Sequence, residues 1–512
     1  MTRPTSITLA TLAALATLLP ACAPTSPGDR GPADPRVDAI FADLRGDRPG
    51  AAVGVLFEGE IVHRAGYGLA NLDHGVPITP ATVFDIASIS KQFGAFAALL
   101  LAAEGGLDLD ADVREYVPEL PDFGAVITPR HLIHHTSGIR DWPHTMALGG
   151  VEFTDVISFE KILRMLRNQQ AINFPPGSEY AYSNTGYNLL AHATEIQSGM
   201  TFRDYTDSRI FAPLGMTRTH FSDDYTEVVP GRAESYAPVP EDSEAGGQAP
   251  GNGETGHAAD PPEQTESAAF RRQPDQLTAL ASSSLHTSID DFILWMRNYE
   301  TAEVGGEALV EAMPRRGILT SGDTISYAHG LSVGTYRGLP TFGHGGSWVG
   351  FRTNFTRFPE QNLSIAVFCN VSDCDPASRA RQVAEVYLGE LMEPLPEPDE
   401  TAEQRPAAEP DGPESRPERP APTPAQLREY TGTYRSPELD SSYEIEVDAG
   451  GRLVATHWRN APTILTPTGP DAFTGDQWFF PRVRFVRDDA GRITAFTVTG
   501  GRVRDLIFER LP

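Results

Sequence analysis

Lysine is nearly absent from this chain. Among the 41 basic residues of the 512-residue sequence, only Lys91 and Lys161 are lysines, and all the others are arginine. Arginine stays protonated in proteins, whereas a buried lysine can lose its proton, so a remaining lysine is a candidate for a position that needs a titratable amine. Clustered cations are also missing, and the net charge of −28 argues against a surface for nucleic-acid phosphates.

Cysteine is scarce too, with three residues in all. Residues 1–23 combine an early arginine, an apolar stretch and small residues, which is typical of a secretory signal. The motif Leu19-Pro20-Ala21-Cys22 is similar to a bacterial lipobox with Cys22 as the lipidated residue, although the same residues also fit an ordinary cleavage site. We expect an exported protein of the periplasm or cell envelope, with a lipid on Cys22 as its only membrane attachment. For Cys369 and Cys374, both a disulfide and two unlinked thiols remain open.

The first lysine lies in a long apolar segment. Lys91 is the only charged residue between Asp85 and Glu104, and Gly105-Gly106 follows, a pattern typical of a buried helix that ends at glycine. Ser88 lies three positions before Lys91, and residues three apart share a helix face. Burial disfavours the ammonium form, so a neutral Lys91 amine can accept the hydroxyl proton of Ser88. The segment predicts a serine nucleophile with a lysine base.

The second lysine repeats the spacing in a different setting. Ser158 precedes Lys161 by three positions, but charged residues adjoin this lysine and the segment after it is amphipathic. We expect Ser158 to cap a helix and Lys161 to be a solvated residue of its first turn. Spacing alone is therefore weak evidence, and the apolar surroundings favour Ser88 and Lys91.

Length and patterning predict two ordered domains. In residues 34–392, a hairpin over residues 51–65 and strands over residues 350–368 enclose a mostly helical middle, so we expect an α+β domain whose sheet joins sequence-distant strands. Alternating strands over residues 425–512 predict a small all-β domain. Two segments have a composition typical of disorder. Residues 238–266 have almost no large apolar residue, and we expect a disordered insertion there; residues 393–424 are rich in proline and acidic residues, and we expect a stiff linker.

Further motifs follow Ser88 and Lys91 in order along the chain. They are Arg130-His131-Leu132-Ile133-His134-His135-Thr136-Ser137-Gly138, Tyr182-Ser183-Asn184, His344-Gly345-Gly346-Ser347 and Pro359-Glu360. Together with Phe84-Asp85-Ile86-Ala87-Ser88-Ile89-Ser90-Lys91, they resemble the serine β-lactamase superfamily, above all class C β-lactamases, D-aminopeptidases, D-alanyl-D-alanine carboxypeptidases and β-lactamase-fold esterases. The resemblance implies an antiparallel sheet flanked by helices, with an all-helical subdomain. The strands of residues 425–512 resemble the lipocalin-like, barrel-like domain that is often appended to these hydrolases.

The resemblance also implies roles for the motif residues. Ser88 would be the acylated nucleophile, Lys91 its base or a proton relay, and Tyr182 the group that carries a proton to the leaving group. Asn184 would orient both the lysine and the substrate amide.

A second set of residues would bind the substrate. The backbone N–H groups of Ser88 and Ser347 would form an oxyanion hole, and Gly345 and Gly346 would let a substrate backbone lie against the strand. His344 stands where true β-lactamases have a lysine that binds the substrate carboxylate. Because histidine is mostly neutral at pH 7, this departure favours neutral esters, or amides with a free amino end.

We therefore expect an exported serine hydrolase that cleaves an amide or ester of a small molecule or peptide through an acyl-Ser88 intermediate, without metal or organic cofactor. The alternatives are a D-alanyl-D-alanine carboxypeptidase or β-lactamase of low activity, and a non-catalytic penicillin-binding-like module. His131, His134 and His135 have the spacing of metal ligands, but no carboxylate joins them and we expect a structural role.

Overall fold

The computed structural model describes residues 33–239, 269–394 and 423–512. The predicted signal segment with Cys22 lies outside these ranges, as do most of the predicted insertion and most of the predicted linker. Within the described ranges, no helix has the length and hydropathy that crossing a membrane requires.

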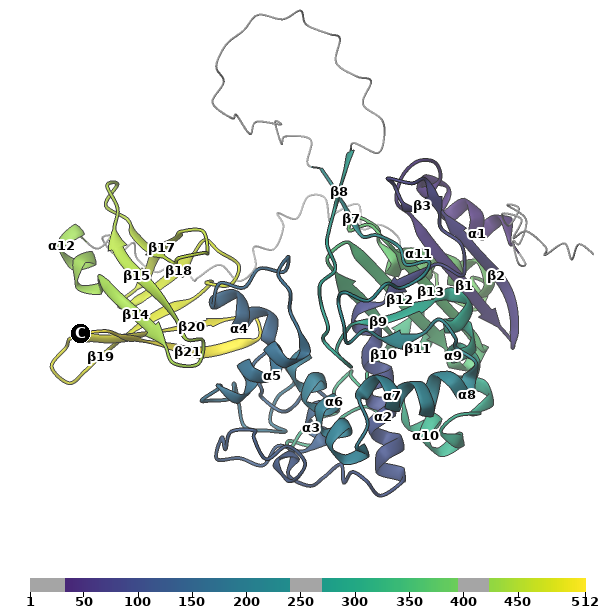
Figure 1. The fold of residues 1–512 in the computed structure, drawn as a ribbon, viewed down its shortest axis with the longest axis horizontal. Helices are drawn as coiled ribbons and strands as arrows, with labels where there is room; N and C mark the ends of the chain where they lie inside the picture. The colour runs from purple at the N-terminus through teal and green to yellow at the C-terminus, as the bar shows by residue number, and fades with distance from the viewer. Residues whose placement is uncertain (1–32, 240–268, 395–422) are drawn as a thin grey trace, which may run out of the picture.

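A six-stranded antiparallel sheet forms the centre of the larger domain (Figure 1). Its strand order is β10-β11-β12-β13-β1-β2, so the N-terminal hairpin joins strands from the far end of the domain, as predicted. One long strand, β11, was not predicted in full, because glycine at its centre has low β propensity. The bounds are β1 (Ala51–Phe57), β2 (Glu60–Tyr67), β10 (Ser332–Tyr336), β11 (Leu339–Trp348), β12 (Phe351–Phe358) and β13 (Leu363–Cys369).

Helices cover both faces of this sheet. Successive side chains of a strand point to opposite faces, and in β1 Leu56 joins the core beneath α9 (Ile289–Thr301), whereas Val55 joins the core beneath α11 (Pro376–Leu388) and α1 (Pro35–Ile40). This double coverage explains why nearly every residue of β1 is buried.

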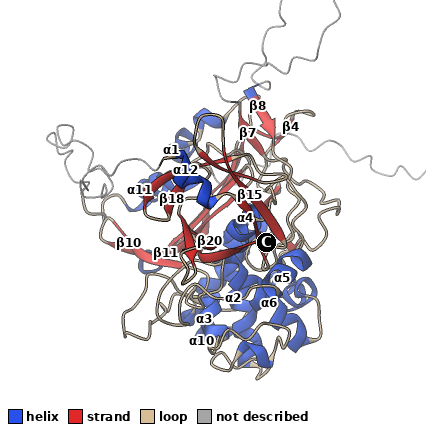
Figure 2. Cartoon of the chain, turned by 90° about the vertical axis from the view of Figure 1, so that its left-hand side faces the viewer, coloured by secondary structure: helices blue, strands red, loops and turns tan. Residues whose placement is uncertain are grey.

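The remaining helices gather on one side of the sheet and form a helical subdomain (Figure 2). Its central helix, α2 (Ser90–Ala103), is apolar nearly all round because other helices and the sheet surround it. The other helices are α3 (Pro129–Ile133), α4 (Trp142–Leu148), α5 (Phe159–Arg167), α6 (Asn184–Ser198), α7 (Phe202–Thr206), α8 (Ala212–Leu214) and α10 (Gly306–Ala312).

Short strands of the described ranges form three smaller sheets. One small sheet has the order β5-β9-β6, and two hairpins pair β3 with β4 and β7 with β8. Their bounds are β3 (Leu69–Asn71), β4 (Val76–Pro77), β5 (Val83–Asp85), β6 (His220–Phe221), β7 (Tyr236–Pro238), β8 (Phe270–Arg272) and β9 (Leu285–Ser288).

The C-terminal strands form a closed eight-stranded antiparallel barrel, preceded by α12 (Pro424–Leu427). The barrel lies beside α4, and Leu148 of that helix belongs to the hydrophobic core of the barrel (Figure 1). A buried ion pair between Arg140 and Glu438, 2.5 Å apart, also joins the two domains. The strands are β14 (Gly432–Ser436), β15 (Ser441–Val447), β16 (Leu453–Thr456), β17 (Thr463–Gly469), β18 (Ala472–Gly475), β19 (Val483–Arg487), β20 (Ile493–Gly500) and β21 (Val503–Arg510).

Cys369 and Cys374 form a disulfide at the end of β13. Of the two states that the sequence leaves open for these residues, the structure contains the linked one.

Candidate active site

Ser88 lies on a tight turn in front of α2. The turn is a short 3-10 helix over Ala87–Ile89, so Ser88 precedes the α-helix rather than lying within it as the sequence suggested. Ala87 has a φ of +49°, a left-handed conformation that non-glycine residues rarely adopt. The backbone N–H of Ala87 donates to Asp85 (2.6 Å) and the Thr353 hydroxyl donates to the carbonyl of Ile86 (2.9 Å), so two neighbours hold this strained turn.

The amine of Lys91 is enclosed and close to Ser88. Lys91 has 0% exposure, and its Nζ is 3.2 Å from Ser88 Oγ, 2.8 Å from Asn184 Oδ1 and 2.7 Å from the carbonyl of Ser282. A neutral amine has two N–H bonds and one lone pair. When Lys91 is protonated, its ammonium donates to all three oxygens; when it is neutral, its two N–H bonds can go to the two carbonyl oxygens and its lone pair can accept the hydroxyl proton of Ser88.

Burial disfavours the protonated form of Lys91. It holds the pKa of this amine well below its ordinary value of 10.5; the charge of Arg502 lowers the pKa further, and Asp141 opposes both effects. The position of Lys91 at the start of α2 acts in the same direction, because the N-terminal end of a helix repels cations. The amine is therefore suited to accept a proton.

The second serine and lysine pair has no such site. Ser158 caps α5 by accepting the backbone N–H of Lys161 at 3.2 Å, and Lys161 Nζ donates to the carbonyl of Val156 at 3.4 Å. The predicted capping role of Ser158 is confirmed, and Lys161 lies in the first turn of the helix.

Asn184 begins α6 and is fixed by a buried carboxylate. Asp141 is 1% exposed and accepts both the backbone N–H of Asn184 (2.7 Å) and its side-chain Nδ2 (3.1 Å). These two bonds turn the amide oxygen of Asn184 toward Lys91. Asp141 was not predicted, and its sequence neighbourhood carries no signal of this role.

The barrel contributes a residue to the site. Arg502, at the turn between β20 and β21, pairs with Asp141 at 2.8 Å, and its guanidinium carbon lies 4.5 Å from the ring centroid of Tyr182. The carbonyl of Arg502 accepts the N–H of Asp141 (3.3 Å) and the Nδ2 of Asn173 (3.0 Å), so the turn itself is anchored. The only sign of this hairpin in the sequence is its Gly501-Arg502 turn. The contact between Arg502 and Asp141 could not be predicted, because the two residues are far apart in the sequence.

Tyr182 keeps its proton. Burial raises the pKa of its phenol well above 10, although a hydrogen bond with Ser88 and the charge of Arg502 lower it. Lys91 Nζ lies 4.7 Å from the ring centroid, but the depressed pKa of that amine makes Arg502 the lasting cation beside the phenol. The arrangement suits a phenol that donates a proton, rather than a tyrosinate base.

Strand β11 runs along the turn Ala87–Ile89, which carries Ser88 and is called the nucleophile turn after the predicted role of that serine. A Cβ atom on Gly346 would lie 2.1 Å from Thr353 Oγ1 and 2.3 Å from the carbonyl of Ile86, whereas one on Gly345 would meet only a backbone oxygen 3.8 Å away. Gly346 is therefore required for packing against the turn, and not only for access of a substrate. Ser347, next on the strand, lines the same cleft as Ser88.

Both ring nitrogens of His344 are hydrogen-bonded to other groups of the protein. Nε2 lies 3.0 Å from the hydroxyl of Tyr327, and Nδ1 lies 2.6 Å from the carbonyl of Gly345. Burial and the neighbouring Lys91 lower the pKa of His344 to about 4, so the ring is neutral at pH 7. The structure therefore gives His344 no free nitrogen with which to bind a substrate.

His131, His134 and His135 each have an internal partner. Nδ1 of His135 accepts the N–H of Ser183 at 3.1 Å, and Nδ1 of His131 accepts the N–H of Thr128 at 3.2 Å. His134 contacts the carbonyl of Arg130 at 3.1 Å. These bonds support the structural role expected for the three histidines.

The site opens into a cleft of about 870 Å³. Ser88, Tyr182 and Asn184 lie in its wall, and the Arg502 side chain, 46% exposed, borders it from the barrel. Aromatic side chains form another part of the wall: Trp142, Phe153 and Trp348. The cleft thus joins polar groups around the serine hydroxyl to an apolar surface.

Comparisons with known proteins agree with this fold. The family model described as Beta-lactamase matches residues 37–388. The chain is 28% identical over 360 residues to a D-aminopeptidase of Gluconobacter oxydans, covering 70% of this chain and 62% of that protein. A D-aminopeptidase of Brucella anthropi is 27% identical, covering 62% of this chain and 56% of that protein. The chain thus spans about three fifths of the length of these relatives.

Solved structures share the fold. An octameric penicillin-binding protein homologue from Pyrococcus abyssi has a TM-score of 0.58 at 23% identity, covering 92% of this chain and 98% of that chain. A D-amino acid amidase from Ochrobactrum anthropi has a TM-score of 0.55 at 21% identity, covering 70% of this chain and 99% of that chain.

Proposed function

The chain belongs to the Beta-lactamase family, and on this premise we propose that it is a serine hydrolase that cleaves amides or esters through an acyl-Ser88 intermediate. The observation that carries the proposal is the enclosed amine of Lys91, 3.2 Å from Ser88 Oγ, 2.8 Å from the side-chain oxygen of Asn184 and 2.7 Å from the carbonyl of Ser282. Binding alone needs no amine with a depressed pKa, which disfavours a non-catalytic module.

The proposed acylation proceeds in three proton transfers. Lys91 Nζ accepts the hydroxyl proton of Ser88 while Ser88 Oγ forms a bond to the carbonyl carbon of the substrate. The backbone N–H groups of Ser88 and Ser347 stabilise the oxyanion. When the intermediate collapses, the bond to the leaving group breaks, the Tyr182 phenol gives its proton to the leaving atom, and Lys91 returns a proton to Tyr182.

Deacylation follows the same route with water. Lys91 takes a proton from water as its oxygen attacks the acyl carbon, the ester bond to Ser88 breaks, and Ser88 Oγ regains the proton. Every group then returns to its starting protonation state, so the protons of the whole cycle are balanced by these residues and water.

Our preferred substrates are amides of D-amino acids with a free amino end. D-aminopeptidases are among the relatives, and the neutral, internally bonded His344 offers no cation for a substrate carboxylate. One observation favours a second candidate, a D-alanyl-D-alanine carboxypeptidase or β-lactamase: the half-exposed guanidinium of Arg502 borders the cleft and has the charge that a substrate carboxylate requires.

Parallel assays separate these candidates. D-amino-acid p-nitroanilides, p-nitrophenyl esters, a D-alanyl-D-alanine peptide and nitrocefin should be offered to the same preparation, and we expect the D-amino-acid amides to give the highest kcat/KM. A fluorophosphonate probe should label Ser88, as seen by mass spectrometry. Labelling elsewhere, or unchanged hydrolysis by Ser88→Ala, would leave only a different site or a binding module.

We also propose that the protein is exported and carries a lipid on Cys22, on the strength of the residues that precede this cysteine. Expression of the full chain in a bacterial host with an alkyne fatty acid should label the wild type and not Cys22→Ser. Secretion of an unlabelled wild-type protein would favour simple cleavage.

A further inference from the structure

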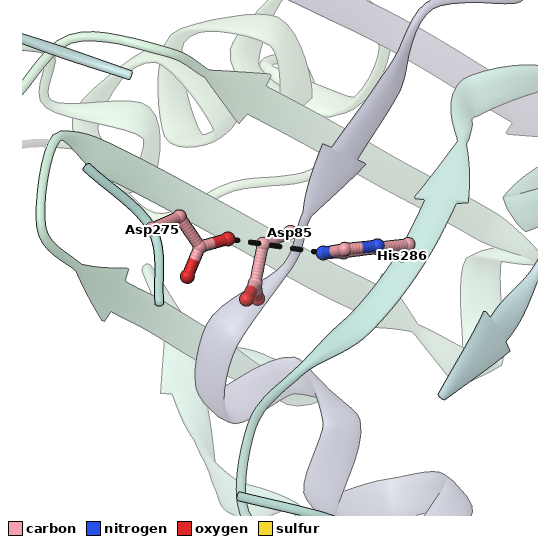
Figure 3. Close-up of side chains that lie close together, drawn as sticks. All are labelled: Asp85, Asp275 and His286. Carbon is pink, nitrogen blue, oxygen red and sulfur yellow. Dashed lines mark ion pairs between the residues drawn. The ribbon is translucent and has the colours of Figure 1, made fainter. Parts of the chain in front are cut away.

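Three side chains behind the nucleophile turn converge from different segments (Figure 3). Asp85 ends β5, His286 lies opposite it on β9, and Asp275 comes from the segment that precedes β9. We propose that Asp85, Asp275 and His286 bind a divalent transition-metal cation of the Zn²⁺ or Mn²⁺ class. This site is separate from the chemistry proposed for Ser88.

The spacing of the ligand atoms suits a cation. One oxygen of each aspartate and one ring nitrogen of His286 all lie within 4.8 Å of one another. His286 Nε2 is 3.8 Å from Asp275 Oδ2, which is too long for a hydrogen bond. Two ligands about 2.1 Å from a shared zinc are separated by roughly 3–4 Å, so a small closing movement would complete the coordination.

The cluster is buried and incompletely bonded. Asp85 is 0% and His286 2% exposed, yet among the described residues Asp85 Oδ2 has no hydrogen-bond partner, and His286 Nε2 has only the long contact with Asp275. Buried charges are normally paired or bound to metals, and a second carboxylate beside Asp85 makes the burial still less favourable. Burial and the carboxylate of Asp275 raise the pKa of Asp85, whereas backbone hydrogen bonds from Ala87 and Ser284 and the charge of Arg232 lower it. A cation between Asp85 and Asp275 would stabilise both buried carboxylates in their charged form.

The donor set decides the class of cation. Two carboxylate oxygens with one imidazole nitrogen suit Zn²⁺ and Mn²⁺, whereas Ca²⁺ prefers six or more oxygen ligands. Among the described residues, this is the one group of three histidine, cysteine or acidic side chains with such spacing.

The proposed cation would connect two walls of the cleft. Asp85 Oδ1 accepts the backbone N–H of Ala87, the strained residue next to Ser88. Asp275 Oδ1 accepts the indole N–H of Trp348, on β11, at 2.9 Å. Asp85, Asp275 and His286 do not line the cleft themselves, so the cation would position the turn and the strand without touching substrate.

Calorimetry on the untagged full-length chain tests the site. After removal of metals with a chelator, titration with ZnCl₂ and with MnCl₂ should give one binding site per chain, whereas CaCl₂ should bind at least about tenfold more weakly. Binding should also change the tryptophan fluorescence, because Trp348 contacts Asp275. Absence of zinc and manganese binding by the folded wild type would overturn the proposal.

Two variants and a matched control locate the site. Asp275→Asn and His286→Gln should weaken zinc binding at least about tenfold. Asp291→Asn should bind zinc as the wild type does, since Asp291 is also a buried aspartate but accepts hydrogen bonds from Arg218 and Thr219 outside the cluster. Equal zinc affinity in wild type, Asp275→Asn and His286→Gln would place the metal elsewhere and overturn the proposal.

Thermal unfolding gives a second, independent readout. Without metal, Asp275→Asn should melt at or above the temperature of the wild type, because it removes a buried carboxylate that repels Asp85. Saturating zinc should raise the melting temperature of the wild type and of Asp291→Asn but not that of Asp275→Asn. Stabilisation of Asp275→Asn by zinc to the same extent as the wild type would contradict the assignment.

Discussion

Arg502 of the C-terminal barrel forms an ion pair with Asp141 of the helical subdomain, with 2.8 Å between Nη1 and Oδ2. Asp141 in turn binds Asn184, whose amide oxygen accepts from Lys91. A chain of contacts therefore leads from the barrel to the amine beside Ser88. The barrel is part of the candidate active site and not merely attached to it.

Removal of this guanidinium should change the pH dependence of hydrolysis. Arg502 lowers the pKa of Lys91 and Asp141 raises it. In Arg502→Ala the charge of Asp141 acts alone, the pKa of Lys91 rises, and the acid limb of the kcat/KM profile should move to higher pH. Arg504→Ala is the matched control, because Arg504 lies two residues further on, in β21, but pairs with exposed Glu179. Identical profiles for wild type and Arg502→Ala would contradict the proposed coupling.

Charge alone should not replace Lys91. Lys91→Arg keeps a cation that cannot lose its proton, so kcat/KM should fall by about 10²–10⁴-fold, the usual contribution of a general base. Lys161→Arg, which repeats the substitution at the capped start of α5, should keep wild-type activity. Measurable turnover by Lys91→Arg near the wild-type rate would exclude the amine as the base.

A methyl group on β11 should disturb the site. In Gly346→Ala the new Cβ meets Thr353 Oγ1 and the carbonyl of Ile86 at 2.1 and 2.3 Å, so the strand must move away from the nucleophile turn. We expect a loss of stability of about 1–3 kcal/mol and a large fall in kcat/KM. Gly334→Ala on neighbouring β10 has open space and should change neither quantity. Denaturant unfolding and steady-state kinetics measure both.

Acid should weaken the fold through buried histidines. Burial lowers the pKa of His134 and of His329 to about 4 from 6.5, so between these values the unfolded chain binds more protons than the folded one. The free energy of unfolding should therefore fall as the pH drops from 6.5 toward 4, by about 1–3 kcal/mol for each ring.

Variants at these rings check the assignment. The double variant His134→Gln/His329→Gln should lose less stability than the wild type between pH 7 and pH 5, as measured by urea unfolding. His74→Gln, at an exposed histidine, should retain the wild-type pH dependence. If all three proteins lost stability equally, other groups would account for the acid effect.

Local patterns in the sequence predicted much of the larger domain. The hairpin of β1 and β2, the buried helix around Lys91 and the strands β12 and β13 follow from apolar spacing and turn residues, which act between near neighbours. The approach of Ser88 to Lys91 is local too, since one turn of helix brings them together. The family resemblance supplied the expected order of Tyr182, Asn184 and Ser347.

Contacts between residues that lie far apart in the sequence were not predicted. Strand β11 is glycine-rich because its backbone must approach the turn at Ile86. Glycine has a low β propensity, so the sequence did not predict the full strand. The role of Gly346 in packing, the internal hydrogen bonds of His344 and the cluster of Asp85, Asp275 and His286 all depend on which segments become neighbours.

The sequence by itself determined that Ser88 and Lys91 lie close together in apolar surroundings, because residues three positions apart in a helical turn are brought together by local backbone geometry. Only the tertiary structure decided the environment of that pair: Asp141, Arg502 and Asn184 come from three separate segments, and the pKa of Lys91 depends on their distances and on the burial that the assembled domains create.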